Sequence, residues 1–106
     1  MSKFVLRISA QYEQDFSQKM DYISFKLRNP DAARELYWAV DKAVAERLDF
    51  AESFEPYHSR KDRKNIYYRI YVKNFEIYYV VIEEDGIKYM ELRRFLYQGE
   101  NRQQKV

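Results

Sequence analysis

The sequence contains no cysteine and only one histidine, two glycines and two prolines among its 106 residues. Without cysteine the chain can form neither a disulfide framework nor a thiolate metal site, so a reducing compartment is the natural expectation. The single histidine, His58, leaves little for a metal site built from nitrogen ligands. We therefore expect neither a metal ion nor a small-molecule cofactor.

Long apolar runs are also missing. No stretch approaches the roughly 20 residues that span a bilayer, and no charged-then-apolar signal peptide opens the chain. The length suits a single domain over residues 1–106, with room for one hydrophobic core. These features predict a soluble cytoplasmic protein with no membrane partner.

Charge is distributed unevenly, although the net charge is only +2. Residues 1–56 carry 8 Lys and Arg against 10 Asp and Glu, a balance of −2, whereas residues 57–106 carry 11 against 7, a balance of +4. The segment 57–69 predicts either a solvated loop or a basic rim for a polyanion or an acidic partner. Its positive side chains, which face one acid, are Arg60, Lys61, Arg63, Lys64 and Arg69.

Aromatic and β-branched residues dominate the stretch 66–97, which two short turn signals at 73–74 and 83–86 divide into three runs. Such side chains fill a pleated surface well, and Asn and Asp-Gly supply tight turns, so the pattern predicts a three-stranded antiparallel meander. Its first strand alternates, with an apolar face and a face that carries polar groups. The first face holds Ile66, Tyr68, Ile70 and Val72, and the second holds Tyr67, Arg69, Tyr71 and Lys73.

The N-terminal half predicts a short strand and two helices that cover this sheet. Residues 3–8 alternate as a strand does, and Ser9 can cap the helix that follows. Asn29 and Pro30 end that helix and begin the next, since proline suits the first helical position. The helices carry two apolar stripes, Tyr12, Phe16, Met20, Ile23 and Leu27 in the first, and Ala33, Leu36, Val40, Val44 and Leu48 in the second.

The short link between these helices predicts an antiparallel αα-hairpin. Trp38 falls off the second stripe, which favours either an indole that leans over a neighbouring turn or an interface. Residues 51–65 predict a loop, and residues 98–106 a frayed end or a short terminal helix. The expected fold is α+β in the order β-α-α-β-β-β, with an N-terminal helical hairpin packed on one face of a small antiparallel sheet.

Three segments carry a resemblance to a known family: NPDAARELYWAV at 29–40, YYRIYVKNFEIYYVV at 67–81, and ELRRFLY at 91–97. Their order and spacing resemble the RelE/ParE superfamily of toxins from bacterial type II toxin–antitoxin modules. The resemblance implies a RelE/ParE-like fold and a growth-inhibitory toxin, of the kind found in plasmid stabilization modules, that a cognate antitoxin protein neutralises.

The superfamily has two well-known activities. RelE-like members cut messenger RNA on the ribosome, whereas ParE-like members poison DNA gyrase. RNA cleavage needs a base for the ribose 2′-hydroxyl, cations around the phosphorane and a donor for the leaving oxygen. By resemblance, a ribonuclease site would use Arg69, Arg94 and Tyr97, and the rim for nucleic acid or a partner would use Arg60, Lys61, Arg63, Lys64 and Arg93.

Strand alternation sets a condition on that site. Arg94 has the parity of Leu92 and Leu96, whereas Tyr97 has the parity of Arg93. Unless a bulge or twist intervenes, Arg94 and Tyr97 point to opposite faces of the sheet.

Two positions depart from the ribonuclease pattern. Glu76 stands where RelE-like enzymes usually carry an arginine, and Leu96 stands where some members place a histidine. These departures favour a ParE-like gyrase poison. The alternatives are a RelE-like, metal-independent mRNA endoribonuclease and a non-toxic antitoxin-binding module, because function resides in the site rather than in the fold. A general RNA-binding domain is disfavoured, since no RNP-type or KH-type signature is present.

Overall fold

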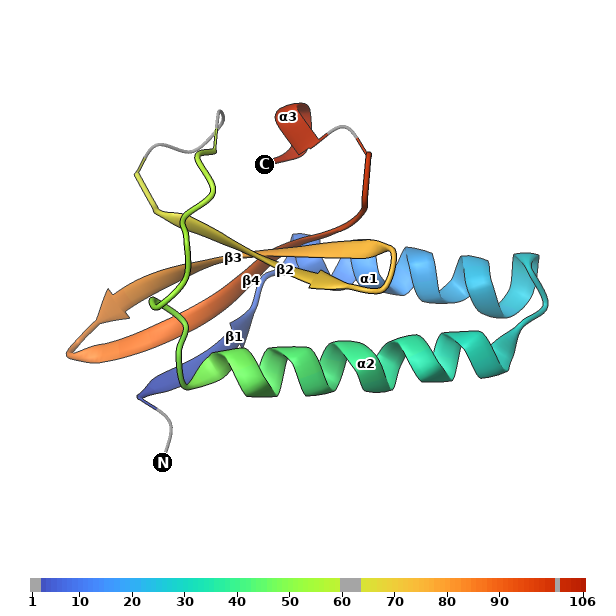
Figure 1. Ribbon diagram of the computed structural model, residues 1–106, viewed down its shortest axis with the longest axis horizontal. Helices are drawn as coiled ribbons and strands as arrows, with labels where there is room; N and C mark the ends of the chain where they lie inside the picture. The colour runs from blue at the N-terminus through green and yellow to red at the C-terminus, as the bar shows by residue number, and fades with distance from the viewer. Residues whose placement is uncertain (1–2, 60–63, 101) are drawn as a thin grey trace.

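The computed structural model describes residues 3–59, 64–100 and 102–106. Its elements, in chain order, are β1 (Phe4–Ile8), α1 (Ala10–Asp21), the π-helical segment η1 (Tyr22–Lys26), α2 (Pro30–Leu48), β2 (Tyr67–Val72), β3 (Phe75–Glu84), β4 (Ile87–Tyr97) and α3 (Arg102–Lys105). Figure 1 shows α1 and α2 as an antiparallel hairpin that extends to the right of the strands, with α2 below the sheet and α3 above it. The α+β class is confirmed, and α3 is the short terminal helix that is one of the two outcomes expected for residues 98–106.

The four strands form one mixed sheet in the order β1-β4-β3-β2. Strands β2, β3 and β4 make the predicted antiparallel meander. The expectation of a wholly antiparallel sheet is wrong, because β1 pairs with β4 in parallel, from Phe4 beside Lys88 to Ile8 beside Leu92. Parallel neighbours need a long connection, and the helical hairpin with the first two meander strands supplies it.

Local chemistry sets the helix starts where the sequence predicts them. The Ser9 hydroxyl accepts a hydrogen bond from the backbone N–H of Tyr12 at 3.1 Å, and the Asn29 side chain accepts one from Ala32 at 3.1 Å. The prediction of the first apolar stripe is wrong at its C-terminal end, because Leu27 is exposed. Its N–H bonds to the carbonyl of Tyr22, five residues earlier, so the π-helical turn rotates the stripe away from the core.

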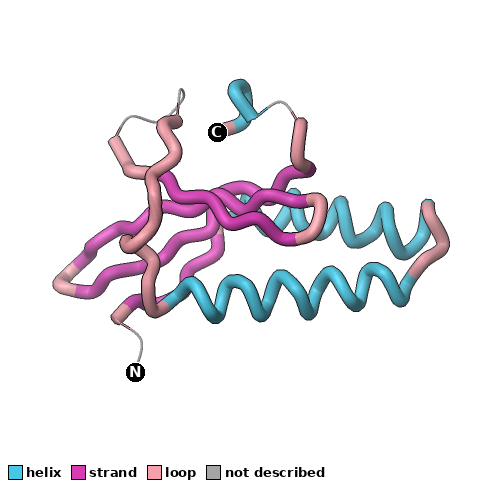
Figure 2. Tube along the Cα trace, viewed as in Figure 1, coloured by secondary structure: helices cyan, strands magenta, loops and turns pink. Residues whose placement is uncertain are grey.

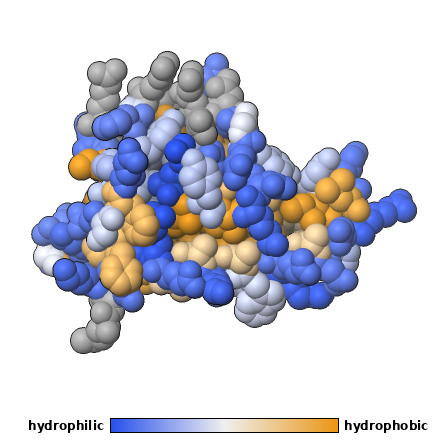
Figure 3. Space-filling model, in the orientation of Figure 1, coloured by the Kyte–Doolittle hydropathy of each residue, from blue (hydrophilic) through white to orange (hydrophobic). Residues whose placement is uncertain are grey.

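The main core lies between the hairpin and the sheet. Its helical side is the buried part of the second predicted stripe, Ala33, Leu36, Val40 and Val44, and its sheet side includes Tyr68, Ile70, Val72, Ile77, Tyr79, Met90, Leu92 and Phe95. Figure 3 shows apolar surface along the line where the sheet meets α2. Trp38 stays outside this core, 62% exposed, and makes an edge contact with the ring of Tyr37.

The face of the sheet that points away from the hairpin, which we call the outer face, is also covered. A second, smaller apolar cluster lies there, made of Tyr67, Tyr78, Val80, Leu96 and Val106, with Tyr57 packed against it. The expectation of a single apolar face is therefore wrong, and Ile66, predicted on the buried face of β2, is exposed before the strand begins. Figure 2 shows that the segment directly after α2 runs past the edge of the sheet toward this face.

Candidate functional site

A bulge in β4 decides which side chains share the outer face. Tyr79 lies opposite Leu92 while Tyr78 lies opposite Arg94, so Arg93 is an extra residue in β4. Leu92 belongs to the main core before the bulge, and Phe95 belongs to it afterwards. Because the extra residue precedes Arg94, it does not bring Arg94 and Tyr97 onto one face.

The cross-strand register aligns two predicted site residues. Arg69 lies opposite Tyr78, and Tyr78 lies opposite Arg94, so the three form one row across β2, β3 and β4. In the next row Glu76 lies between Tyr71 and Leu96. The outer face therefore carries two arginines on either side of a tyrosine, with a glutamate beside them.

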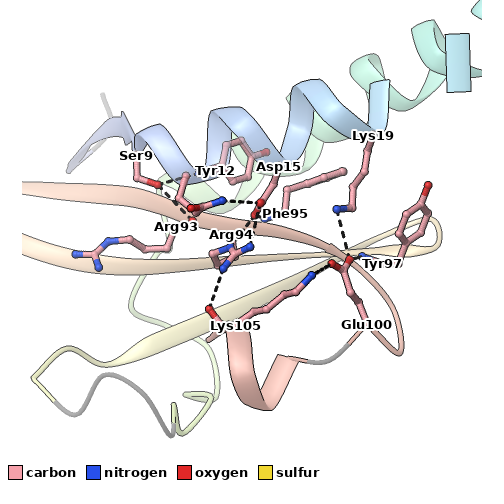
Figure 4. Close-up of polar contacts among 11 residues, drawn as sticks. Ser9, Tyr12, Asp15, Lys19, Arg93, Arg94, Phe95, Tyr97, Glu100 and Lys105 are labelled. Atoms are coloured by element: carbon pink, nitrogen blue, oxygen red, sulfur yellow. Dashed lines mark hydrogen bonds and ion pairs between the residues drawn. The ribbon is translucent and has the colours of Figure 1, made fainter. Parts of the chain in front are cut away.

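Arg94 is held by α1. Its Nε and Nη2 donate to the two carboxylate oxygens of Asp15 at 2.7 and 3.0 Å, and its Nη1 donates to the carbonyl of Lys105 at 3.2 Å (Figure 4). Such a two-pronged pair with a carboxylate is among the strongest side-chain contacts. Every nitrogen that Arg94 could present to a substrate is thus engaged in holding the fold.

Asp15 takes this role because β1 is short. β1 ends at Ile8, opposite Leu92, so in the described part of the chain no strand lies beside this edge of β4 beyond that point. The carboxylate of Asp15, only 4% exposed, accepts from the backbone N–H of Phe95 at 3.0 Å as well as from Arg94. It thereby satisfies a backbone donor that would otherwise be buried without a partner.

Arg69 is partly neutralised. Its Nη1 lies 3.9 Å from Oε2 of Glu76, and its guanidinium lies over the rings of Tyr57 and Tyr71 at 5.2 and 4.8 Å. The hydroxyl of Tyr78 donates to Oε1 of Glu76 at 3.0 Å. Burial raises the pKa of Tyr78 to about 12, so this phenol stays neutral at physiological pH.

Tyr97 lies on the hairpin side of the sheet. Its ring packs on Phe75 at 4.6 Å between centroids and lies 5.3 Å from the ammonium of Lys19. Burial, with Tyr22 and Glu100 nearby, raises the pKa of its hydroxyl. The structure therefore separates Tyr97 from Arg69 and Arg94, and the three predicted catalytic residues do not converge.

The predicted basic rim is only partly described. Lys64 is exposed in the turn before β2, whereas Arg60, Lys61 and Arg63 lie outside the described residues. Arg93, the extra residue of the bulge, forms an ion pair with Glu91.

A pocket of about 550 Å³ lies where the α2–β2 loop meets the edge of β2. We call it the edge pocket. His58 and Arg69 both line it, and so does Arg47 of α2. Sequence reasoning did not identify Arg47 as a site residue, because it lies at the edge of the apolar stripe of its helix. The lining residues are Arg47, Phe54, Glu55, Pro56, Tyr57, His58, Arg69 and Tyr71.

A second hollow of about 350 Å³ lies between α1, α2 and β1. Its walls are mainly apolar, including Leu6, Phe16 and Val40, and two acids, Glu13 and Asp41, lie along it. It contains none of the predicted site residues.

Sequence reasoning also missed Asp15 and Tyr78. Asp15 lies between Tyr12 and Phe16 of the first stripe, and an acid on the buried side of an amphipathic helix is the signal that could have identified it. Nothing in the sequence distinguishes Tyr78 from the other aromatic residues of the predicted strands.

Within the described ranges, no three His, Asp or Glu side chains gather in a way that could hold a metal ion. In the same part of the chain, no helix has the length and apolarity that a membrane crossing requires. No protein-family model matches the chain, and neither a curated protein nor a solved structure matches it with significance.

Proposed function

We propose that this protein is the toxin of a type II toxin–antitoxin module and acts in the ParE-like manner, by poisoning DNA gyrase. Support comes from the three resembling segments at 29–40, 67–81 and 91–97, which lie in the first part of α2, in β2 and most of β3, and in the end of β4. In this proposal the toxin is growth-inhibitory and is neutralised by a cognate antitoxin protein.

The ion pair between Arg94 and Asp15 is the observation that favours gyrase over messenger RNA as the target. Phosphodiester cleavage needs cations that are free to meet the charge that develops on the phosphorane. Both carboxylate oxygens of Asp15 are bound to Arg94, at 2.7 and 3.0 Å, and breaking such a pair in a largely buried site costs about 3–5 kcal/mol.

Glu76 weakens the ribonuclease alternative further. Its buried carboxylate lies beside the row of Arg69 and Tyr78. A phosphate held 4 Å from a carboxylate is repelled by about 1 kcal/mol in water, and by more where water is excluded. A toxin that acts by binding a protein target needs no such catalytic set.

The test uses purified protein in two assays. We expect inhibition of gyrase supercoiling or trapping of cleaved DNA, and we expect messenger RNA on the ribosome to remain intact. Codon-specific cuts in a translation extract that disappear with Arg69→Ala or Tyr97→Phe would show that the protein is a ribonuclease. If neither assay responds and expression is harmless, the protein is a non-toxic antitoxin-binding module.

A further inference from the structure

The edge pocket contains a guanidinium group, that of Arg47, that no acid among the described residues neutralises. Nη1 of Arg47 donates to the hydroxyl of Tyr79 at 3.0 Å and to the carbonyl of Arg69 at 3.4 Å. These contacts fix the guanidinium but add no negative charge. Among the described residues no acid pairs with Arg47, and its Nε and Nη2 bond to no atom of these residues.

The second cation of the pocket is Arg69. Its distance of 3.9 Å from Glu76 is longer than a direct hydrogen bond. The guanidinium also contacts the rings of Tyr57 and Tyr71 and forms a hydrogen bond with the hydroxyl of Tyr78. Because Glu76 lies beside Arg69, a phosphate is better placed on Arg47, which can donate two hydrogen bonds in a plane from Nε and Nη2 while Arg69 adds positive charge.

Aromatic rings form much of the remaining wall. The guanidinium of Arg47 lies 3.5 Å from the centroid of the Phe54 ring. Tyr71 is 57% exposed, so one side of its ring is open to a planar group. Exposed aromatic rings beside arginines bind nucleobases by stacking, whatever the base.

One acid also lines the pocket. Glu55 is exposed near the two arginines, and a carboxylate there can accept hydrogen bonds from the amino group of a base. The pocket volume of about 550 Å³ lies within the range of small-ligand sites. The cations, the stacking surface, the acceptor and the size together match one nucleotide unit.

We propose that the edge pocket binds a nucleoside phosphate, with the phosphate on Arg47, which is not paired with Glu76, and the base stacked on Tyr71. This inference goes beyond the proposed function, and its test contains neither gyrase nor ribosome. A negative result therefore leaves the gyrase proposal standing. The ligand is either a free nucleotide or one unit of a nucleic acid strand, and the test distinguishes these sources.

The experiment is calorimetric titration of the protein with the four common ribonucleoside 5′-monophosphates, with inorganic phosphate and nucleosides as partial ligands. We expect at least one monophosphate to bind, and each partial ligand to bind more weakly. Arg47→Gln should weaken binding at least about fivefold. Lys42→Gln is the matched control, because Lys42 is an exposed cation of α2 that does not line the pocket.

Tyr71 supplies a variant at an exposed position, for which loss of folding is not a concern. Tyr71→Ala should weaken binding at least about fivefold by removing the stacking surface, whereas Tyr71→Phe should keep it. Equal affinity of Tyr71→Ala and the unmodified protein would overturn the stacked geometry.

Two further ligands test whether the nucleotide belongs to a nucleic acid strand and whether the pocket binds an acidic protein segment instead. A short single-stranded oligonucleotide that binds more tightly than any monophosphate, and loses this with Arg47→Gln, supports a strand as the source. A glutamate-rich peptide that displaces the nucleotide at equal concentration would overturn the proposal in favour of an acidic protein segment. Absence of binding by every nucleotide at millimolar concentration, which corresponds to about −4 kcal/mol, would also overturn it.

Discussion

At the scale of single residues, Asp15 joins parts of the chain that are far apart in sequence. It lies in α1, yet it binds the side chain of Arg94 and the backbone of Phe95 in β4. Lys19, one turn further along α1, forms an ion pair with Glu100 at 3.4 Å. The first helix is thus tied to the last strand by charge as well as by apolar packing.

Replacement of Asp15 tests this tie. Asp15→Asn should lower the free energy of unfolding by about 3 kcal/mol, because it leaves the charge of Arg94 without its partner in a largely buried site. Chemical denaturation measures the loss. Asp31→Asn is the control, since Asp31 forms an exposed pair with Arg34 and such pairs contribute about 0–1 kcal/mol. Equal losses in the two variants would contradict the role assigned to Asp15.

Because the pKa of the Tyr78 phenol is raised in the folded protein, we expect stability to fall in alkali. Burial raises the pKa of this phenol from 10.0 to about 12. Because the folded state holds this proton more tightly, the stabilisation is complete below pH 10 and is lost as the pH rises toward 12. Urea melts across this range should show a steeper decline for the unmodified protein than for Tyr78→Phe. Parallel curves would show that Tyr78 does not contribute.

At the scale of elements, the features that sequence predicts well are the local ones. Ser9 and Asn29 cap the helices as expected, because a cap bonds to an N–H only three residues away. The meander follows from alternation and turn residues for the same reason. Buried Ala33, Leu36, Val40 and Val44 follow from helical spacing.

The features that sequence misses depend on distant partners. The parallel pairing of β1 with β4 joins residues more than 80 positions apart, and nothing near Phe4 specifies that neighbour. The bulge at Arg93 breaks the alternation that placed Arg94 with Leu92. Sequence identified Arg69 and Arg94 as candidates, but their carboxylate partners come from other parts of the fold.

Leu36 tests the placement of α2. Leu36→Ala should lower the free energy of unfolding by about 2–5 kcal/mol, through lost apolar burial and the cavity that remains. The neighbouring exposed position provides the control, Glu35→Ala, which should change stability by less than about 0.5 kcal/mol. A loss of only a few tenths for Leu36→Ala in denaturant melts would show that α2 does not pack through this face.

At the scale of the whole molecule, positive charge is concentrated in the segment that precedes β2. Of its four basic residues between positions 60 and 64, the structure describes Lys64, which is exposed. Exposed charges of one sign speed the approach of an oppositely charged partner and are screened by salt. In the proposed module, an antitoxin with an acidic extended stretch after an amphipathic helix would be complementary in charge to this segment.

Charge reversal tests that partner surface. Changing Arg60, Lys61, Arg63 and Lys64 to Glu should weaken the proposed complex with an antitoxin and reduce the dependence of its affinity on salt. Titrations at several salt concentrations measure both effects.

The control reverses three exposed cations of the helical hairpin, Lys26, Arg34 and Lys42. If the hairpin variant weakens the complex as much as the loop variant does, the effect reflects net charge rather than a docking surface. Unchanged affinity of the loop variant at every salt concentration would exclude the loop as a contact.

The parallel seam between β1 and β4 also imposes an order on synthesis. A nascent chain can form the helical hairpin and pair β2 with β3 while β4 is still being made, but β1 has no neighbour until residues 88–92 have been added. The Asp15–Arg94 pair needs the same late residues. Contacts between such distant positions form slowly, because a long loop must close first. The first strand therefore waits as an unpaired apolar segment during translation, and a chain cut short before β4 cannot complete either the sheet or the row of Arg69, Tyr78 and Arg94.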